Sequence, residues 1–197
     1  MKYLWIVAVI LLSGCTVMEP HKLEYRIMPN VAIKKVDSLS CREKSLKVRR
    51  VFSSSSFLSQ NMKYVENGNK EFSFTESKWA RSPSGAISAA LMNSINKQNI
   101  FAHVSSFKSR SRSDLILETN VEDFMQYFTK DNNSSYVRVA FSMSLIDTRK
   151  NKVLKSKQFE KELMVDTIDA KGGVKALNKA LSEVLEENNK WLMDSCK

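Results

Sequence analysis

The stretch that decides the fold is Val137-Arg138-Val139-Ala140-Phe141-Ser142-Met143-Ser144-Leu145. Apolar side chains occupy every second position from 137 to 145, which is typical of a β-strand with one buried face. Asp131-Asn132-Asn133 predicts a turn before this strand, and Lys150-Asn151 predicts another after it. The segment is therefore expected to be the middle strand of an antiparallel meander.

Two further long strands flank it, at residues 115–128 and 153–165. The first is predicted to carry a bulge, because its apolar phase drifts along the strand. Two helices are predicted near 82–98 and 172–193, where apolar residues recur at helical spacing. Ser82 is expected to cap the first helix, and Pro83 suits its first turn. The apolar stripe of the second helix predicts either a core face or a face lying on a membrane. We favour the core, because the sheet needs cover.

Shorter elements complete an α+β architecture, with an antiparallel or mixed sheet covered on one face by two helices. Asn67-Gly68-Asn69 predicts a hairpin turn, because Gly and Asn tolerate positive φ. The serine run at 53–56 predicts a plain flexible loop. The remaining short strands are expected at residues 22–27 (an edge strand), 44–52, 62–65, 71–75 and 101–107.

The composition indicates one globular domain. The chain has 197 residues, of which 43% are hydrophobic and 26% charged, values that exclude a collagen-like or wholly disordered chain. A net charge of +10 favours anionic partners such as membrane head groups, although a solvated basic surface without a ligand is the alternative. Five Gly and two His leave little for a phosphate-binding loop, a metal site or histidine catalysis.

The N-terminus has the pattern of a secretory signal, with Lys2 followed by an apolar run at residues 3–12. That run is too short to span a bilayer, which needs about 20 residues. Leu12-Ser13-Gly14-Cys15 resembles the bacterial lipobox, which predicts cleavage before Cys15 and acyl chains, palmitate among them, on that residue. An unlipidated signal or a buried strand is the alternative. Thr16 after the Cys resembles an outer-membrane sorting signal, and a location outside the cytoplasm argues against a nucleic-acid partner.

Two cysteines remain once Cys15 is lipidated, namely Cys41 and Cys196. An even pair in an oxidising compartment predicts one disulfide that ties the start of the domain to its end. Two free thiols are the alternative.

No catalytic motif is present, so we expect neither an enzyme, nor a metal, nor a cofactor. Glu118, Glu122 and Asp123 share one predicted strand, where carboxylates more often face solvent than perform acid–base work. His21 falls in the N-terminal segment, and His103 is expected on the surface of a strand. Gly172-Gly173 precedes a helix and could bind an anion there, but a simple connection is favoured. Asn133 lies in an acidic glycosylation sequon, for which an unmodified turn is the alternative.

An ordered set of landmarks resembles the ABC-type transport auxiliary lipoprotein family, which includes the lipoprotein of paraquat-inducible operons. The set spans nearly all of the mature chain, although the charged tether and the absence of Pro at 53–56 depart from the family pattern. Its members are Cys15, Tyr25-Arg26-Ile27-Met28-Pro29, Leu46-Lys47-Val48, Phe57-Leu58, Tyr64, Lys78-Trp79-Ala80, Phe101, Val104, Asp114-Leu115, Val121, Phe124 and Leu145-Ile146-Asp147.

The resemblance implies a signal peptide at 1–14, a lipid-anchored tether with a short strand at 15–40, and the auxiliary lipoprotein domain at 41–197. It also implies a non-catalytic docking or lipid-handling part of an Mce-type phospholipid transport system, working beside an Mce-domain protein, an ABC permease and an ATPase. Phospholipid and a second copy of the chain are further candidate partners. The alternative is an assembly lipoprotein of another envelope machine, for secretion or for lipopolysaccharide. The family supplies no ligand-binding residues to carry over.

Overall fold

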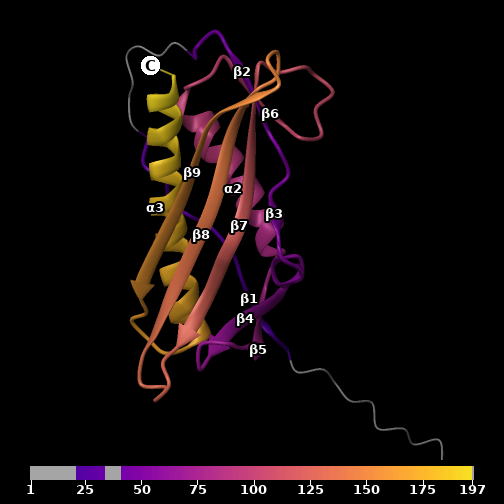
Figure 1. The fold of residues 1–197 in the computed structure, drawn as a ribbon. Helices are drawn as coiled ribbons and strands as arrows, with labels where there is room; N and C mark the ends of the chain where they lie inside the picture. Colours follow the sequence, from indigo (N-terminus) through magenta and orange to yellow (C-terminus); the bar gives the residue numbers. More distant parts are fainter. Residues whose placement is uncertain (1–20, 34–40, 197) are drawn as a thin grey trace, which may run out of the picture.

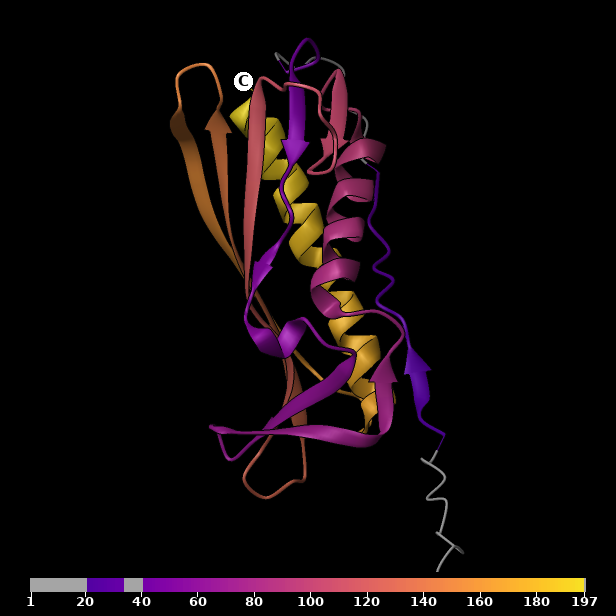
Figure 2. The ribbon, with the colours of Figure 1, turned by 90° about the vertical axis from the view of Figure 1, so that its right-hand side faces the viewer.

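The computed structural model describes residues 21–33 and 41–196. These residues form a mixed sheet of nine strands with both helices packed on one face, which confirms the predicted α+β fold (Figures 1 and 2). The elements in chain order are β1 Leu23–Tyr25, β2 Ser45–Val48, β3 Phe52–Ser53, the 3-10 helix η1 Ser55–Phe57, β4 Asn61–Glu66, β5 Lys70–Trp79, α2 Pro83–Gln98, β6 His103–Ser106, β7 Leu115–Phe128, β8 Ser135–Asp147, β9 Lys152–Met164 and α3 Ala170–Ser195.

The meander predicted around residues 137–145 is present as β7, β8 and β9, which pair antiparallel in sequence order. The register between β7 and β8 shifts between Val121 and Asp123, so Glu122 is the extra residue of the predicted bulge. Val137, Val139 and Phe141 are fully buried beneath the helices. The alternating pattern therefore predicted both the strand and its buried face.

Three short strands pair with the edge of β7 that faces away from β8, an arrangement that the sequence did not predict. β2 pairs with its beginning, β3 with its middle and β4 with its end, all of them parallel to β7. β6 extends the sheet beyond β2, while β5 and then β1 extend it beyond β4. β4 and β5 form the predicted hairpin, and its turn places Asn67 and Gly68 at positive φ, of 51° and 80°. β1 is the predicted edge strand.

Both helices contribute buried side chains to the hydrophobic core. This confirms the prediction that the apolar stripe of the C-terminal helix faces the core. Leu181, Val184 and Leu185 of α3 are fully buried, as are Ile87 and Leu91 of α2. Burial of each large aliphatic side chain contributes about 1.5–3 kcal/mol. Within the described parts of the chain, no helix combines the length and the apolar character needed to cross a membrane.

Two local expectations were wrong. Ser82 occupies the N-cap position of α2, but its side chain makes no capping hydrogen bond; its carbonyl accepts from the N–H of Ala86 instead. The serine run is not a plain loop, because residues 53 and 55–56 belong to β3 and η1. Phe57 is 3% exposed and anchors this connection in the core.

The predicted disulfide between Cys41 and Cys196 is present, with Cα atoms 5.3 Å apart. It joins the segment that enters β2 to the end of α3. β1, near the beginning of the described chain, lies toward the opposite end of the domain (Figure 1). The chain therefore enters at one end of an elongated domain, and the disulfide closes the other end.

Candidate functional site

Residues 26–32, here called the strap, run in extended form along α3. Its backbone donates three hydrogen bonds to side chains spaced four residues apart on the helix. Four helical residues rise about 6 Å, close to the advance of two residues in an extended chain, so every second strap N–H meets an acceptor. The pairs are Met28 to Asn178 Oδ1 at 2.6 Å, Asn30 to Ser182 Oγ at 2.9 Å and Ala32 to Glu186 Oε1 at 3.1 Å.

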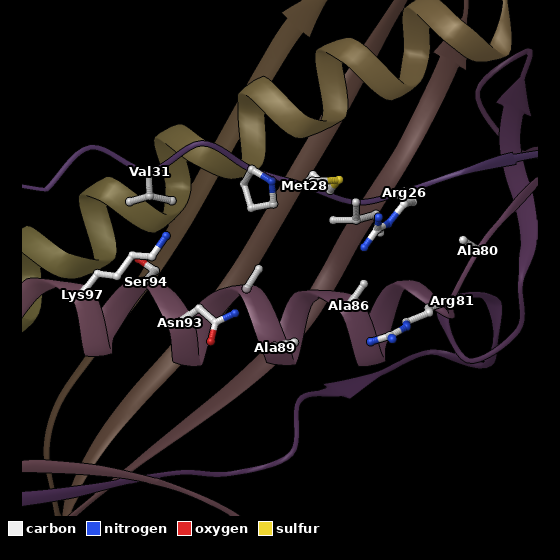
Figure 3. A pocket seen from close by; sticks show the side chains of 13 residues that line it. Arg26, Met28, Val31, Ala80, Arg81, Ala86, Ala89, Asn93, Ser94 and Lys97 are labelled. Atoms are coloured by element: carbon white, nitrogen blue, oxygen red, sulfur yellow. The ribbon is translucent and has the colours of Figure 1, made fainter.

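A cleft of about 440 Å³, here called the strap cleft, separates the strap from α2 (Figure 3). Small side chains on α2 leave this space open, because Ala86, Ala89 and Ala90 line it where longer residues would fill it. Ile27 and Val31 of the strap are half-buried and supply apolar surface opposite. Its volume lies in the range of ligand-binding pockets.

The strap cleft carries positive charge. Arg26 and Arg81 lie at one end and Lys97 at the other (Figure 3), and its lining contains no acidic residue. None of these three cations takes part in an ion pair with a described residue. The Arg26–Arg81 end also meets the start of α2, whose first turn has no acidic residue and no side-chain cap. The positive end of that helix dipole therefore adds to the two guanidinium groups.

The three carboxylates predicted to face solvent on β7 have different environments. Glu122 is exposed at the bulge and Glu118 is half-buried, whereas Asp123 is only 8% exposed. The Tyr127 hydroxyl donates to Asp123 Oδ2, and Arg138 Nε lies 4.0 Å from the same oxygen. Burial raises the pKa of the Asp123 carboxyl, and burial followed by the Asp123 hydrogen bond raises the pKa of Tyr127. The expectation of a solvated carboxylate was thus wrong for Asp123. The register shift at the bulge places Asp123 at a buried position of β7, beside Tyr127.

Asp123→Asn is expected to stabilise the protein at neutral pH. Because the folded-state pKa of Asp123 is raised, wild-type stability falls as pH rises from the ordinary aspartate range through that raised value. Asn cannot ionise, so the variant avoids this loss. Urea midpoints measured between pH 4 and pH 8 should diverge in favour of the variant as pH rises. A variant less stable than wild type at pH 7 would mean that the attraction of Arg138 outweighs burial.

Gly172-Gly173 serves packing at the start of α3, which agrees with the favoured interpretation of a simple connection rather than an anion site. The Gly172 N–H already donates to Asp169 Oδ1 at 2.7 Å. A Cβ on Gly172 would lie 2.2 Å from the Thr167 carbonyl oxygen, and one on Gly173 would lie 2.0 Å from Gln126 Oε1. Position 172 therefore needs glycine, because the Thr167 carbonyl is backbone, whereas a Cβ at position 173 would require the Gln126 side chain to move.

The other predicted residues are not brought to the strap cleft. Asn133 is exposed in the β7–β8 turn, where its Nδ2 donates to Asp131 Oδ2 at 3.1 Å, and its glycosylation stays a prediction. His103 is exposed at the start of β6, as expected, and His21 is exposed ahead of β1. Cys15 lies outside the described residues. Among the described residues, His, Cys, Asp and Glu side chains do not gather where a metal ion could bind.

Sequence reasoning missed the strap cleft. Ala86, Ala89 and Ala90 were visible as small residues on one helical face, with Lys97 two turns further on. The sequence did not indicate that Arg26 would lie opposite them, because that placement depends on hydrogen bonds to residues 150 and 152 positions away.

Several solved structures share this fold. It is similar to the crystal structure of a Xanthomonas campestris protein of family DUF330, with a TM-score of 0.77 and 16% identity over 88% of this chain and 95% of that one. It is also similar to a second, uncharacterized protein, with a TM-score of 0.66 and 14% identity over 87% and 98% of the two chains. A PelC dodecamer from Paraburkholderia phytofirmans follows, with a TM-score of 0.50 and 14% identity over 81% and 96%.

The family model of the ABC-type transport auxiliary lipoprotein component matches residues 34–187, and the chain belongs to this family. The resemblance seen in the sequence landmarks is thereby confirmed. The protein is a lipoprotein of the cell envelope associated with ABC-type transport. No curated protein matches the chain by sequence.

Proposed function

We propose that the protein is a non-catalytic docking and lipid-handling component of an ABC/Mce-type phospholipid transport system, anchored in the outer membrane and facing the periplasm. The observation that carries this proposal is the strap cleft, which combines apolar walls with cations that form no ion pair with a described residue. A phospholipid has the matching chemistry, since its phosphate is anionic and its acyl chains are apolar.

The strap cleft is polarised along its length. Arg26, Arg81 and the start of α2 suit a phosphate group, because guanidinium groups and helix N-termini both favour anions. The alanines beyond them suit an acyl chain, and each buried CH₂ contributes about 0.8 kcal/mol. A lipid would therefore lie with its head at Arg26 and Arg81 and its chain toward Val31 and Ser94.

The position of the anchor agrees with this polarity. Arg26 follows β1, at the end of the domain where the described chain begins (Figure 1). Cys15 stands six positions before His21, and six fully extended residues span about 20 Å. Lipidation of Cys15 would thus hold the Arg26–Arg81 end of the cleft close to the membrane surface.

We assign no catalytic step to this protein. The energy for transport would come from the ATPase of the system, and the lipid would arrive through the Mce-domain protein. The alternative, an assembly lipoprotein of another envelope machine, draws support from the dodecameric state of the PelC protein with the same fold. Capture of secretion or lipopolysaccharide-assembly components without bound lipid would favour that alternative.

The variant Arg26→Glu/Arg81→Glu is expected to lose bound phospholipid. Two reversed charges would repel a phosphate at the head end, so the phospholipid recovered per protein should fall at least tenfold, as measured by mass spectrometry of lipids extracted after purification in mild detergent. Lys179→Glu/Lys190→Glu is the matched control, because it makes the same charge change on exposed positions of α3.

The control should retain wild-type lipid, and wild-type protein should co-purify with an Mce-domain protein. Equal lipid recovery from both variants would contradict the assignment of the strap cleft. Wild-type protein that carries no phospholipid and captures no Mce-domain protein would contradict the proposed function.

A further inference from the structure

A second groove lies on the sheet face that the helices leave open. Lys47 of β2 and Ile116 of β7 are paired in the register and point to this face, because their neighbours Leu46 and Leu117 are buried on the helix side. The groove has a volume of about 690 Å³ and runs over β2, β3 and the beginning of β7. We call it the sheet-face groove.

Large apolar side chains form the rim of the sheet-face groove. Phe52 is 59% exposed, Leu58 52% and Phe107 44%, while Val51 beneath them is 4% exposed. Single exposed apolar residues are ordinary on a protein surface, but three around one groove indicate a surface that a partner covers.

Positive charge surrounds this rim. Arg49 and Arg50 line the groove, and neither forms an ion pair with any residue that the structure describes. Lys47 donates to the carbonyl oxygens of Ser109 at 3.2 Å and Ser111 at 2.6 Å, which holds the basic loop between β6 and β7 beside the groove. No acidic residue lines the groove, so its charge is complementary to carboxylates on a partner.

We propose that the sheet-face groove docks a segment of a partner protein in which carboxylate side chains alternate with apolar ones. Arginine and aromatic residues are the types most enriched at protein interfaces, and here they occur together. The inference rests on the docking part of the proposed function and is independent of the strap cleft.

The location of the groove favours a protein over the bilayer that holds the anchor. β2 and β6 lie toward the end of the domain where α3 finishes, whereas the described chain begins at the other end (Figures 1 and 2). Lipidation of Cys15, six positions before His21, would hold that other end at the membrane, since six fully extended residues reach about 20 Å. The sheet-face groove is then open to the periplasm, where a partner protein can reach it.

The test uses the full lipidated protein in phosphatidylcholine nanodiscs and a fluorescent twelve-residue peptide that alternates Glu with Leu and Phe. Wild-type protein should bind this peptide in an anisotropy titration, more weakly at 300 mM than at 50 mM NaCl. A peptide with Lys in place of Glu should not bind. Arg49→Glu/Arg50→Glu should weaken binding of the Glu peptide at least tenfold and should gain binding of the Lys peptide.

Two further variants distinguish the effect of the two arginines on peptide binding from a general effect of charge reversal and from the contribution of apolar contacts. Lys179→Glu/Lys190→Glu carries the same charge change and should bind the Glu peptide within twofold of wild type. Phe107→Ser, at an exposed position, should weaken binding severalfold at both salt concentrations. Unchanged binding by Arg49→Glu/Arg50→Glu would overturn the proposal. So would capture of phosphatidylglycerol vesicles through these arginines without peptide binding, which would identify a lipid surface instead. Retention of phospholipid in the strap cleft is measured separately, so failure here leaves that result intact.

Discussion

Replacing Cys41 and Cys196 together by serine is expected to lower the free energy of unfolding by about 2–4 kcal/mol, the typical value of a disulfide. The two residues are 155 positions apart and each is 2% exposed. The long loop makes the constraint on the unfolded chain large, up to about 5 kcal/mol in the entropy model. For a domain of this size, about 2–4 °C of melting temperature accompanies each kcal/mol, so a fall of roughly 5–15 °C is expected.

Thermal unfolding followed by circular dichroism measures this effect. Wild-type protein in reductant should approach the variant, whereas the variant should not respond to reductant. Equal melting temperatures for the variant and the oxidised wild type would show that the packing of α3 against the sheet holds the end of the domain without the bond.

Cys15→Ala is expected to move the protein from the membrane fraction to the soluble fraction. The predicted anchor depends on acyl chains at this one residue, and each buried CH₂ of those chains contributes about 0.8 kcal/mol. Two or more chains hold a protein firmly, and loss of all of them removes that attachment. None of the described helices is long and apolar enough to cross a membrane in place of the acyl chains.

Cell fractionation with immunoblotting measures the distribution, and intact mass reports whether acyl chains are present. Cys41→Ser/Cys196→Ser is the control, because it removes two cysteines but leaves the predicted lipid anchor. A Cys15→Ala protein that still sediments with the outer membrane would show that something other than acyl chains attaches it.

Local sequence patterns predicted the strands, the bulge and the turn, whose geometry depends on a few neighbouring residues. The strict alternation at 137–145, the phase drift in 115–128 and the Asn-Gly-Asn turn each reflect geometry within a few residues. The elements that pair across long distances were not predictable in this way. β2, β3 and β4 share one edge of β7, and nothing in three short apolar runs specifies that they lie parallel to it.

Among the candidate sites too, some features were predictable from the sequence, whereas others depend on contacts between distant segments. Cys41 and Cys196 were paired by counting, because few cysteines leave few choices. The strap cleft depends on the strap meeting Asn178 and its neighbours on α3, and the burial of Asp123 depends on which side of the bulge it falls. Both are consequences of tertiary packing, which one sequence does not encode in any local spacing.

The most direct test of the central claim is to locate a bound phospholipid. Lipidated protein in nanodiscs that contain a phosphatidylglycerol with a photoactivatable acyl chain would be irradiated and digested, and the labelled peptides identified by mass spectrometry. We predict labels on the strap and on the face of α2 that carries Ala86, Ala89 and Ala90, and their loss in Arg26→Glu/Arg81→Glu. Labels confined to other surfaces, or unchanged in that variant, would contradict the account.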